Sequence, residues 1–146
     1  MALSDGQLKI IRESYCIIRE SENLYSDQFY HNLFFQHPFI RALFPDDIAN
    51  QCFIFRQTID VLIAECADFG NIQSNLTDLS IRHIKYGAKI EHYAFVGEAL
   101  IGTFEHILGD RFTLEVRQAW EGLYAETSKI MINAAYGGLG IQTERS

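Results

Sequence analysis

Five histidines are the side chains in this sequence best suited to binding a metal or moving a proton: His31, His37, His83, His92 and His106. A helical zinc site needs two histidines four residues apart, and no pair here has that spacing. The sequence also has no Cys-X-X-Cys motif, so it does not predict a dedicated zinc site. We expect His31, His37 and His106 at the surface. His83, taken by itself, is typical of a histidine packed in a helical core.

The rest of the chain indicates that these histidines are carried by helices. Only two prolines occur in 146 residues, and apolar side chains recur every three or four positions. This pattern predicts an all-α domain of six or seven helices. We expect helices to begin near Ser4–Asp5 and then to cover residues 23–35, 39–44, 48–66, 76–85 and 91–108. We expect the last helix to start at Thr113 and to stop at Gly137-Gly138. We expect the segment FGNIQSN, residues 69–75, to be a turn because Gly, Asn and Ser favour turns.

Length and charge narrow the class of protein further. A chain of 146 residues suits one domain, and its 12 basic and 19 acidic side chains give a formal net charge of −7. An acidic surface repels phosphate backbones and anionic lipid headgroups, so we expect neither nucleic acid nor a membrane surface as a partner. No apolar run is long enough to cross a bilayer, and the N-terminus lacks the pattern of a signal peptide. These features predict a cytoplasmic protein.

The segment from Arg82 to Gly109, RHIKYGAKIEHYAFVGEALIGTFEHILG, resembles bacterial globins of the flavohaemoglobin and single-domain haemoglobin lineage. The landmarks shared with this family are His83, His92-Tyr93, Val96-Gly97, the upstream segment FYHNLFFQHPFIRALFP (residues 29–45), and Trp120 and Tyr124 downstream. The resemblance covers residues 8–136. It implies a globin fold, with three helices over three around a haem. It also implies a globin domain at residues 1–136 and a flexible tail or linker start at residues 137–146.

The resemblance implies haem b, iron protoporphyrin IX, as the cofactor and His83 as the residue that holds its iron. A neutral imidazole on a short helix is a suitable iron ligand. Leu79, one turn earlier on the same helix face, is expected to pack beneath the porphyrin. Phe44 corresponds to the family's phenylalanine that wedges against the haem, and Tyr93 corresponds to a tyrosine on the proximal side.

Three further residues are expected on the opposite, distal side of the haem. Tyr30 occupies the family's tyrosine position, where its hydroxyl would point at a bound gas. Counting back from His83 places Gln51 at the distal glutamine and Phe55 one turn later against the haem. The connection between Phe44 and Gln51 is shorter than in the family, so Gln51 is alternatively a solvated residue at the start of its helix. A buried donor stabilises bound O2 by about 1 to 3 kcal/mol and favours it over CO, which carries less charge.

One departure from the family concerns the partner of His83. In flavohaemoglobins a glutamate on the last helix and a tyrosine, here Tyr93, hydrogen-bond to the proximal histidine, and the glutamate position falls on Ala135. Glu126 lies two turns away on a regular helix and is not expected to replace it. We therefore expect the second ring nitrogen of His83 to bind a backbone carbonyl, or to make a weaker contact, near Leu79 or Tyr93. Without a carboxylate partner, the iron is expected to favour O2 binding over peroxidase-like chemistry.

These features leave three functions open. The first is reversible O2 binding at a five-coordinate ferrous iron, for storage or delivery. The second is a gas-sensing domain of a longer signalling protein, such as a globin-coupled cyclase or kinase, because the glycines at 137–140 are typical of the start of a linker. The third is a nitric-oxide dioxygenase served by a separate reductase, against which Ala135 counts. The expected ligands are O2, CO and NO, and a homodimer is compatible with the lineage.

Overall fold

The described part of the chain is built from helices. The computed structural model describes residues 3–21, 24–67, 69–85 and 87–137, and no residue within these ranges forms a strand. This confirms the expected all-α class. The helices are α1 (Asp5–Arg19), α2 (Tyr25–Gln36), α3 (Ala49–Glu65), α4 (Phe69–Lys85), α5 (Ile90–Leu108) and α6 (Leu114–Ile132), with the 3₁₀ helices η1 (Pro38–Leu43) and η2 (Gly109–Arg111) and the π-helical turn η3 (Asn133–Gly137). Most of the expected C-terminal tail, residues 138–146, lies outside the described residues.

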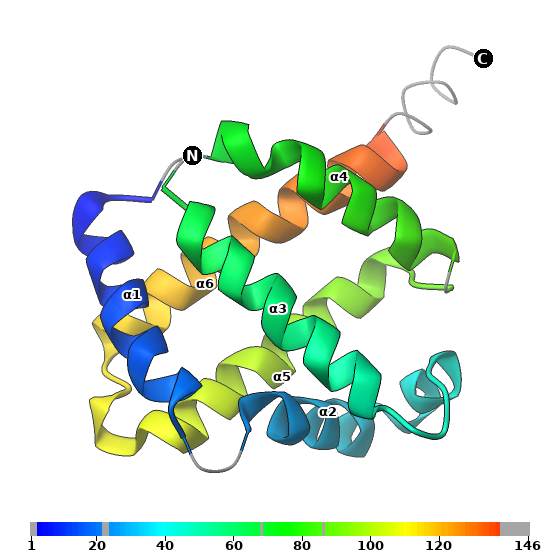
Figure 1. Cartoon of the computed structure of the whole chain (residues 1–146), viewed down its shortest axis with the longest axis horizontal. Coiled ribbons are helices and arrows are strands. Elements are labelled where there is room, and N and C mark those ends of the chain that lie inside the picture. Colours follow the sequence, from blue (N-terminus) through cyan, green and yellow to red (C-terminus); the bar gives the residue numbers. More distant parts are fainter. Residues whose placement is uncertain (1–2, 22–23, 68, 86, 138–146) are drawn as a thin grey trace.

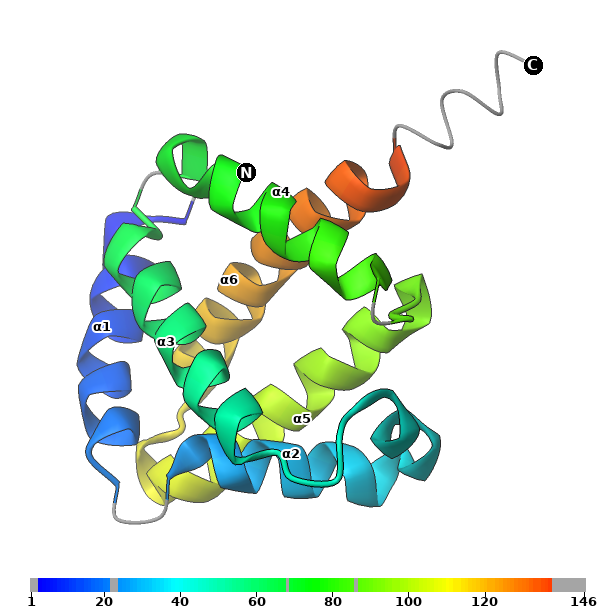
Figure 2. The ribbon, with the colours of Figure 1, turned by 45° about the vertical axis from the view of Figure 1, so that its right-hand side comes forward.

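The α-helices form two layers that cross one another. Figure 1 shows α3 passing in front of α5 and α6, and Figure 2 shows α2 beside α5, and α4 near the C-terminal end of α6. The packing agrees with these views, because α2 contacts α5, α1 and α4 contact α6, and α5 contacts α6. The result is α1, α3 and α4 over α2, α5 and α6. This is the three-over-three arrangement that the sequence predicts.

Local hydrogen bonds fix where the first and last α-helices begin. Ser4 and Gln7 form a reciprocal capping box at α1: the backbone nitrogen of Gln7 donates to Ser4 Oγ at 3.1 Å, and the backbone nitrogen of Ser4 donates to Gln7 Oε1 at 3.0 Å. At α6 the backbone nitrogen of Val116 donates to Thr113 Oγ1 at 3.3 Å. Both helices therefore begin where the sequence predicts.

The start of α4 differs from the sequence-based expectation. The sequence predicts a turn at residues 69–75, and this prediction is wrong, because α4 already begins at Phe69 and continues to Lys85. Gly and Asn lower helix stability by only about 0.5–1 kcal/mol each, and tertiary packing overrides such preferences. Apolar residues at positions 69, 72, 76 and 79 also continue the helical spacing that leads to His83. The longer helix carries His83 in its last turn.

The core between α1, α2, α5 and α6 combines aromatic rings with satisfied polar groups. Phe104 is fully buried and packs on Trp120, with ring centroids 4.5 Å apart. The indole nitrogen of Trp120 donates to Ser14 Oγ at 2.9 Å, and Asn32 Nδ2 donates to Thr103 Oγ1 at 3.1 Å. Buried polar groups are costly unless they are paired in this way. These two bonds tie α1 to α6 and α2 to α5.

Helices α5 and α6 approach each other closely at Gly97. A Cβ atom added to Gly97 would lie 2.7 Å from Tyr124 Cε2 and 2.9 Å from Tyr124 Cδ2, well inside van der Waals contact. The Tyr124 ring is held in place because its hydroxyl donates a hydrogen bond to the carbonyl oxygen of Tyr93. A larger residue at position 97 therefore has to displace α6 or break that bond.

We predict that Gly97→Ala lowers the free energy of unfolding by about 1–3 kcal/mol, because the added methyl group overpacks this contact. Gly102→Ala is the matched control on the same helix. Nothing lies within 4 Å of a Cβ added to Gly102, so this change should be neutral or stabilise the fold by up to about 1 kcal/mol. Denaturant unfolding of both variants gives the comparison, and equal stabilities would contradict the close α5–α6 contact.

Candidate functional site

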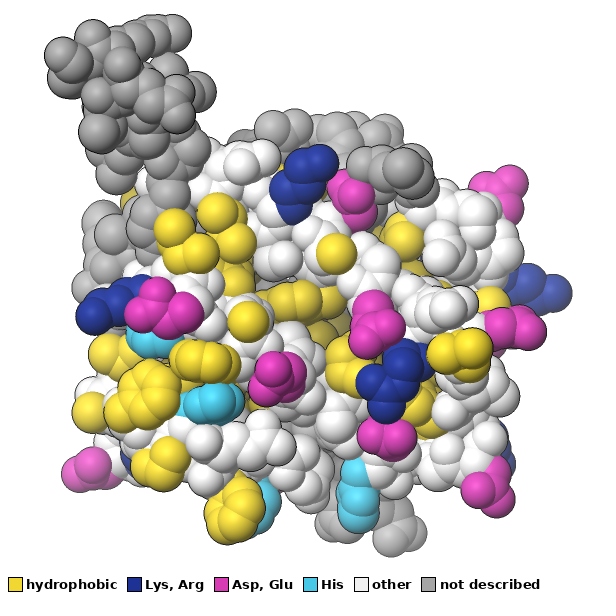
Figure 3. Space-filling view, turned by 180° about the vertical axis from the view of Figure 1, so that it is seen from behind, with side chains coloured by type: hydrophobic (Ala, Val, Ile, Leu, Met, Phe, Trp, Pro, Cys, Tyr) yellow, Lys and Arg dark blue, Asp and Glu magenta, His cyan; other side chains and the backbone are white. Residues whose placement is uncertain are grey.

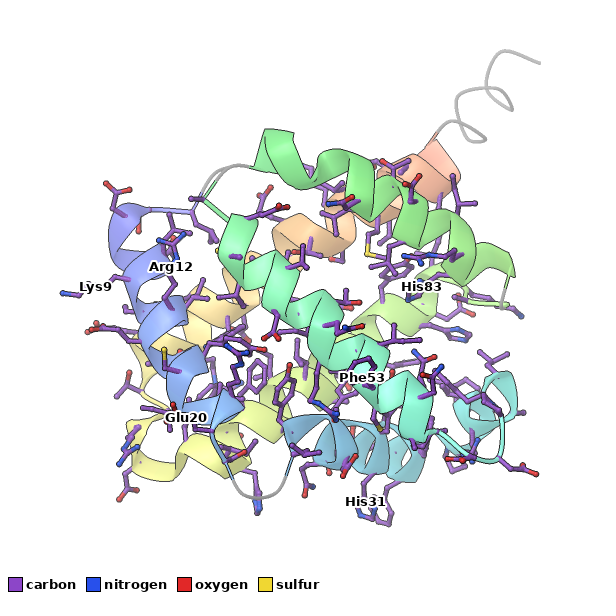
Figure 4. The ribbon with its side chains drawn as sticks, viewed as in Figure 1. Lys9, Arg12, Glu20, His31, Phe53 and His83 are labelled. Atoms are coloured by element: carbon purple, nitrogen blue, oxygen red, sulfur yellow. The ribbon has the colours of Figure 1, made fainter. Side chains whose placement is uncertain are left out.

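His83 lies in the last turn of α4, and its side chain points toward the interior of the molecule (Figure 4). The Nδ1 atom of His83 lies 2.8 Å from the carbonyl oxygen of Leu79, one turn earlier. A carbonyl oxygen only accepts hydrogen bonds, so Nδ1 carries the proton and donates it. The other ring nitrogen, Nε2, then keeps its lone pair. In this tautomer, a histidine can bind a metal ion through Nε2.

The surroundings of His83 keep its imidazole uncharged. Burial lowers the pKa of His83, the hydrogen bond to Leu79 opposes this shift in part, and the charge of Arg82 adds to it. The ring is therefore neutral at physiological pH. No proton has to leave Nε2 before a metal can bind there.

The turn after His83 fixes the end of this helix. The backbone nitrogen of Ala88 donates to the carbonyl oxygen of His83 at 2.9 Å, and Gly87 adopts a φ of +90°. Glycine reaches this left-handed conformation without steric cost. A Cβ atom on Gly87 would lie 3.3 Å from Leu43 Cδ2, so the turn packs against η1. The sequence signal for this role is a glycine directly after the predicted histidine helix.

Tyr30 lies on α2 within a cluster of aromatic rings. Its side chain is buried, and its ring centroid lies 4.9–5.7 Å from the ring centroids of Phe29, Phe34, Phe44 and Phe55. The structure thus brings together three predicted site residues, Tyr30, Phe44 and Phe55, from three separate segments. Phe29 and Phe34 complete the cluster, although the sequence does not single them out as site residues. Their position on the same helix as Tyr30 is the available signal.

Gln51 lies beside Tyr30. The Nε2 atom of Gln51 donates to the hydroxyl oxygen of Tyr30 at 3.2 Å. Burial raises the pKa of Tyr30 to about 12, although the bond from Gln51 acts to lower it, so Tyr30 is a neutral phenol at physiological pH. Because Gln51 occupies the acceptor side of this hydroxyl, the phenolic proton stays available for another acceptor. Gln51 is half-buried beside Tyr30, and its distal role stays a prediction.

The register of α3 turns its predicted site residues inward. Phe55 stacks on Phe29 with ring centroids 4.4 Å apart and planes 10° apart. Phe53, two positions earlier, is 51% exposed and is carried on the outer face of α3 (Figure 4). Residues four apart on a helix share a face, so Gln51 and Phe55 lie together.

The partner of His83 Nδ1 is a backbone carbonyl, as the sequence predicts, and it belongs to Leu79 rather than Tyr93. The Tyr93 carbonyl oxygen instead accepts from the Tyr124 hydroxyl. Ala135 is buried in η3, where its methyl group offers no hydrogen-bonding atom. The Nδ1 proton of His83 is therefore shared with a neutral oxygen.

The remaining histidines differ in their surroundings. His31 and His106 are exposed, as expected, but the expected surface position of His37 is only partly right. His37 is half-buried, and its ring stacks on Phe95 with centroids 3.9 Å apart, because the junction between α2 and η1 lies over the start of α5. Among the described residues, no group of three His, Cys, Asp or Glu side chains could hold a metal ion.

An open groove of about 390 Å³ lies elsewhere, between α5 and α6. Neither His83 nor Tyr30 lines it, and Figure 3 shows the hollowed surface on this rear side. Arg117 lines the groove, where its Nη2 atom lies 3.3 Å from Glu105 Oε2 and its Nη1 atom lies 3.8 Å from Glu121 Oε2. Exposed ion pairs of this kind contribute little to stability. The groove is separate from the cluster around Tyr30.

The site and fold together define a class of protein. The class is an all-α, three-over-three protein with a neutral histidine available to a metal and a phenol–amide pair in an aromatic cluster. Comparison with known families agrees with this class. Residues 27–131 match the model of the globin family, and the chain belongs to this family. Globins bind haem, so the family implies a haem cofactor.

Individual proteins similar to the chain include bacterial flavohemoproteins and haem proteins of known structure. It is 26% identical to a flavohemoprotein of Bacillus subtilis over 125 aligned residues. The alignment covers 84% of this chain and 31% of the relative. The chain thus spans about a third of that relative's length. A bacterial globin from Campylobacter jejuni superposes with a TM-score of 0.82 at 21% identity, covering 94% of this chain and 99% of the other. A hexacoordinated heme protein from a tardigrade superposes with a TM-score of 0.81 at 14% identity. That superposition covers 91% of this chain and 95% of the tardigrade protein.

The residues of the site fit a haem. The tautomer of His83 leaves one imidazole nitrogen for iron, and the half-buried side chains of Leu79, Phe44 and Phe55 are apolar, as a porphyrin requires.

In the part of the chain that the structure describes, no helix is long and apolar enough to cross a membrane.

We predict that His83→Ala removes the iron ligand and lowers haem affinity. Titration of the haem-free chain with haem, followed by absorption, measures this loss. His106→Ala is the matched control, because His106 is exposed on α5, and it should bind haem as the unchanged chain does. Haem uptake by His83→Ala with an unchanged ferrous spectrum would contradict the assignment of His83.

Proposed function

We propose that the chain binds b-type haem through His83 and reversibly binds O2 at a five-coordinate ferrous iron, for storage, delivery or sensing. The observation that carries this proposal is the hydrogen bond from Gln51 to Tyr30, which holds a buried phenolic donor within the aromatic cluster. When bound, haem supplies an iron that takes up a diatomic gas. The remaining chemistry belongs to the side chains around it.

On the proximal side, His83 would hold the iron through Nε2, and the carbonyl oxygen of Leu79 fixes the orientation of the imidazole ring. The Nδ1 proton donates to a carbonyl oxygen at 2.8 Å, which is a weaker acceptor than a carboxylate. The imidazole therefore gains little anionic character and donates less electron density to the metal. This environment favours gas binding, and it would make cleavage of an O–O bond slower than a carboxylate partner would, without preventing it.

On the distal side, the Tyr30 hydroxyl would donate a hydrogen bond to the gas, and Gln51 keeps that hydroxyl oriented. O2 would gain more from this donor than CO, which carries less charge. The rings of Phe44 and Phe55 exclude water, which strengthens the hydrogen bond by lowering the local dielectric. The Tyr30 phenol also keeps its proton, because burial raises its pKa to about 12, and this limits proton delivery to bound oxygen.

The two other functions share this site and differ in what surrounds it. A gas-sensing role requires a signalling domain joined to this one, and sequencing of the gene on both sides tests for it. A nitric-oxide dioxygenase role requires a reductase and an iron with strong proximal electron donation. The carbonyl partner of His83 argues against that second requirement.

We predict that Tyr30→Phe speeds O2 dissociation about tenfold, because it removes one buried hydrogen bond to the ligand. Stopped-flow displacement of O2 by CO measures the rate. Gln28→Ala is the control on the same helix: the amide of Gln28 bonds to Asn32 at 2.9 Å, away from Tyr30, so its O2 off-rate should not change. An unchanged off-rate in Tyr30→Phe would remove Tyr30 from the ligand site.

A further inference from the structure

A continuous run of aromatic rings leads from the distal side to α1. The ring centroid of Tyr30 lies 5.6 Å from that of Phe55, and the centroid of Phe55 lies 6.2 Å from that of Tyr25. Tyr25 in turn lies 5.9 Å from Tyr15, with the two ring planes at 74°. These rings come from α2, α3 and α1, and each is in contact with the next. The run thus links the Tyr30 cluster to the opposite part of the core.

The run ends at a carboxylate. The hydroxyl of Tyr15 donates to Asp60 Oδ1 at 2.6 Å. The hydroxyls of Tyr15 and Tyr25 lie 2.8 Å apart, and because the Tyr15 proton is already directed at Asp60, Tyr25 is the donor in this second bond. Both rings are buried, whereas the Asp60 side chain is 39% exposed and lies 3.6 Å from Arg19 Nε. The two phenols therefore form a proton path that leads to the surface.

This arrangement differs from that of other tyrosines. Tyr30 accepts a hydrogen bond from the Gln51 amide, and Tyr124 donates to a backbone carbonyl. An amide or carbonyl oxygen is too weak a base to take the proton of a phenol that loses an electron, whereas a carboxylate is a much stronger base and can accept it. Burial, then the hydrogen bond to Asp60, raises the pKa of Tyr15, so its phenol is protonated at rest. A proton and an electron can therefore leave Tyr15 together.

We propose that Tyr15 is a redox-active tyrosine that supplies one electron to the haem after the haem has reacted with hydrogen peroxide. The proposal rests on the haem site proposed above. Hydrogen peroxide would be the two-electron oxidant: one of its oxygen atoms would leave as water, and the other would stay with the haem, which would then hold two oxidising equivalents. One equivalent would be filled by an electron that passes from Tyr15 through Tyr25 and Phe55, and the other would remain at the haem. The phenolic proton of Tyr15 moves to Asp60 Oδ1, leaving a neutral tyrosyl radical and a protonated carboxyl group.

The neighbouring tryptophan, Trp120, has no proton acceptor that would let it hold the oxidising equivalent. The Trp120 ring lies 6.2 Å from Tyr15, but its indole N–H donates to the Ser14 hydroxyl, which cannot hold an additional proton. The oxidising equivalent therefore comes to rest on Tyr15. It is held there by proton transfer to Asp60 and is kept away from the haem ligands.

The test uses the haem-loaded ferric protein, with loading first verified by absorption. The protein is mixed with hydrogen peroxide, freeze-quenched and examined by electron paramagnetic resonance, with natural and ring-deuterated tyrosine. We expect a tyrosyl signal whose hyperfine structure narrows on deuteration and that is lost in Tyr15→Phe. Tyr124→Phe is the matched control and should keep the signal, because Tyr124 lies outside the run of rings.

Asp60→Asn tests the proton acceptor while leaving every tyrosine in place. Its amide oxygen still accepts a hydrogen bond from Tyr15 but cannot take the proton, so the signal should again be lost. A tyrosyl signal that survives in Asp60→Asn or in Tyr15→Phe would overturn the proposal, as would the absence of a signal in the haem-loaded unchanged chain. If Tyr15→Phe does not fold, Asp60→Asn and the deuterated unchanged chain decide. Failure to load haem would show in the first absorption spectrum and would overturn the proposed function as well.

Discussion

The hydrogen bond from His83 Nδ1 to the Leu79 carbonyl oxygen determines what the site can do. It spans a single turn of α4, so it persists only while this helix stays regular up to its last turn. It fixes the tautomer of the imidazole and leaves Nε2 with the lone pair that our proposal assigns to the iron. The turn at Gly87, which packs near Leu43 of η1, holds the end of the helix where it is. A neutral carbonyl as partner also sets the electronic character of the imidazole, and this favours gas binding.

The residues that we propose for the distal side depend on the packing of α2 against α3 and α5. Tyr30 is fixed by the surrounding rings and by Gln51, so its hydroxyl has a defined direction without a charged neighbour. The same α2 helix carries Tyr25, whose ring contacts Phe55 on one side and Tyr15 on the other. One aromatic layer thus serves two purposes in our account. It excludes water from the proposed gas-binding site, and it connects that site to the carboxylate of Asp60, a proton acceptor at the surface.

Much of the fold could be predicted from helical periodicity, and the roles of the site residues could not. Capping residues such as Ser4 and Thr113 predict helix starts because their hydrogen bonds are local. The start of α4 was not predictable from turn-forming residues, because tertiary packing outweighs their small preferences. His83 and Tyr30 required the family resemblance, since spacing alone does not distinguish a ligand from a core residue. The bond between Tyr15 and Asp60 joins residues 45 positions apart, and no local pattern predicts it.

The most direct test of this account is the iron–histidine stretching mode in the resonance Raman spectrum of the deoxygenated ferrous protein, assigned by iron isotope substitution. We predict that the mode is present and lies at the low frequency typical of a histidine bonded to a backbone carbonyl, as in oxygen-carrying globins. Its presence shows His83 on a five-coordinate iron, and its frequency reports the partner of Nδ1. A missing mode, or one at the high frequency typical of a carboxylate-bonded histidine, would contradict the account.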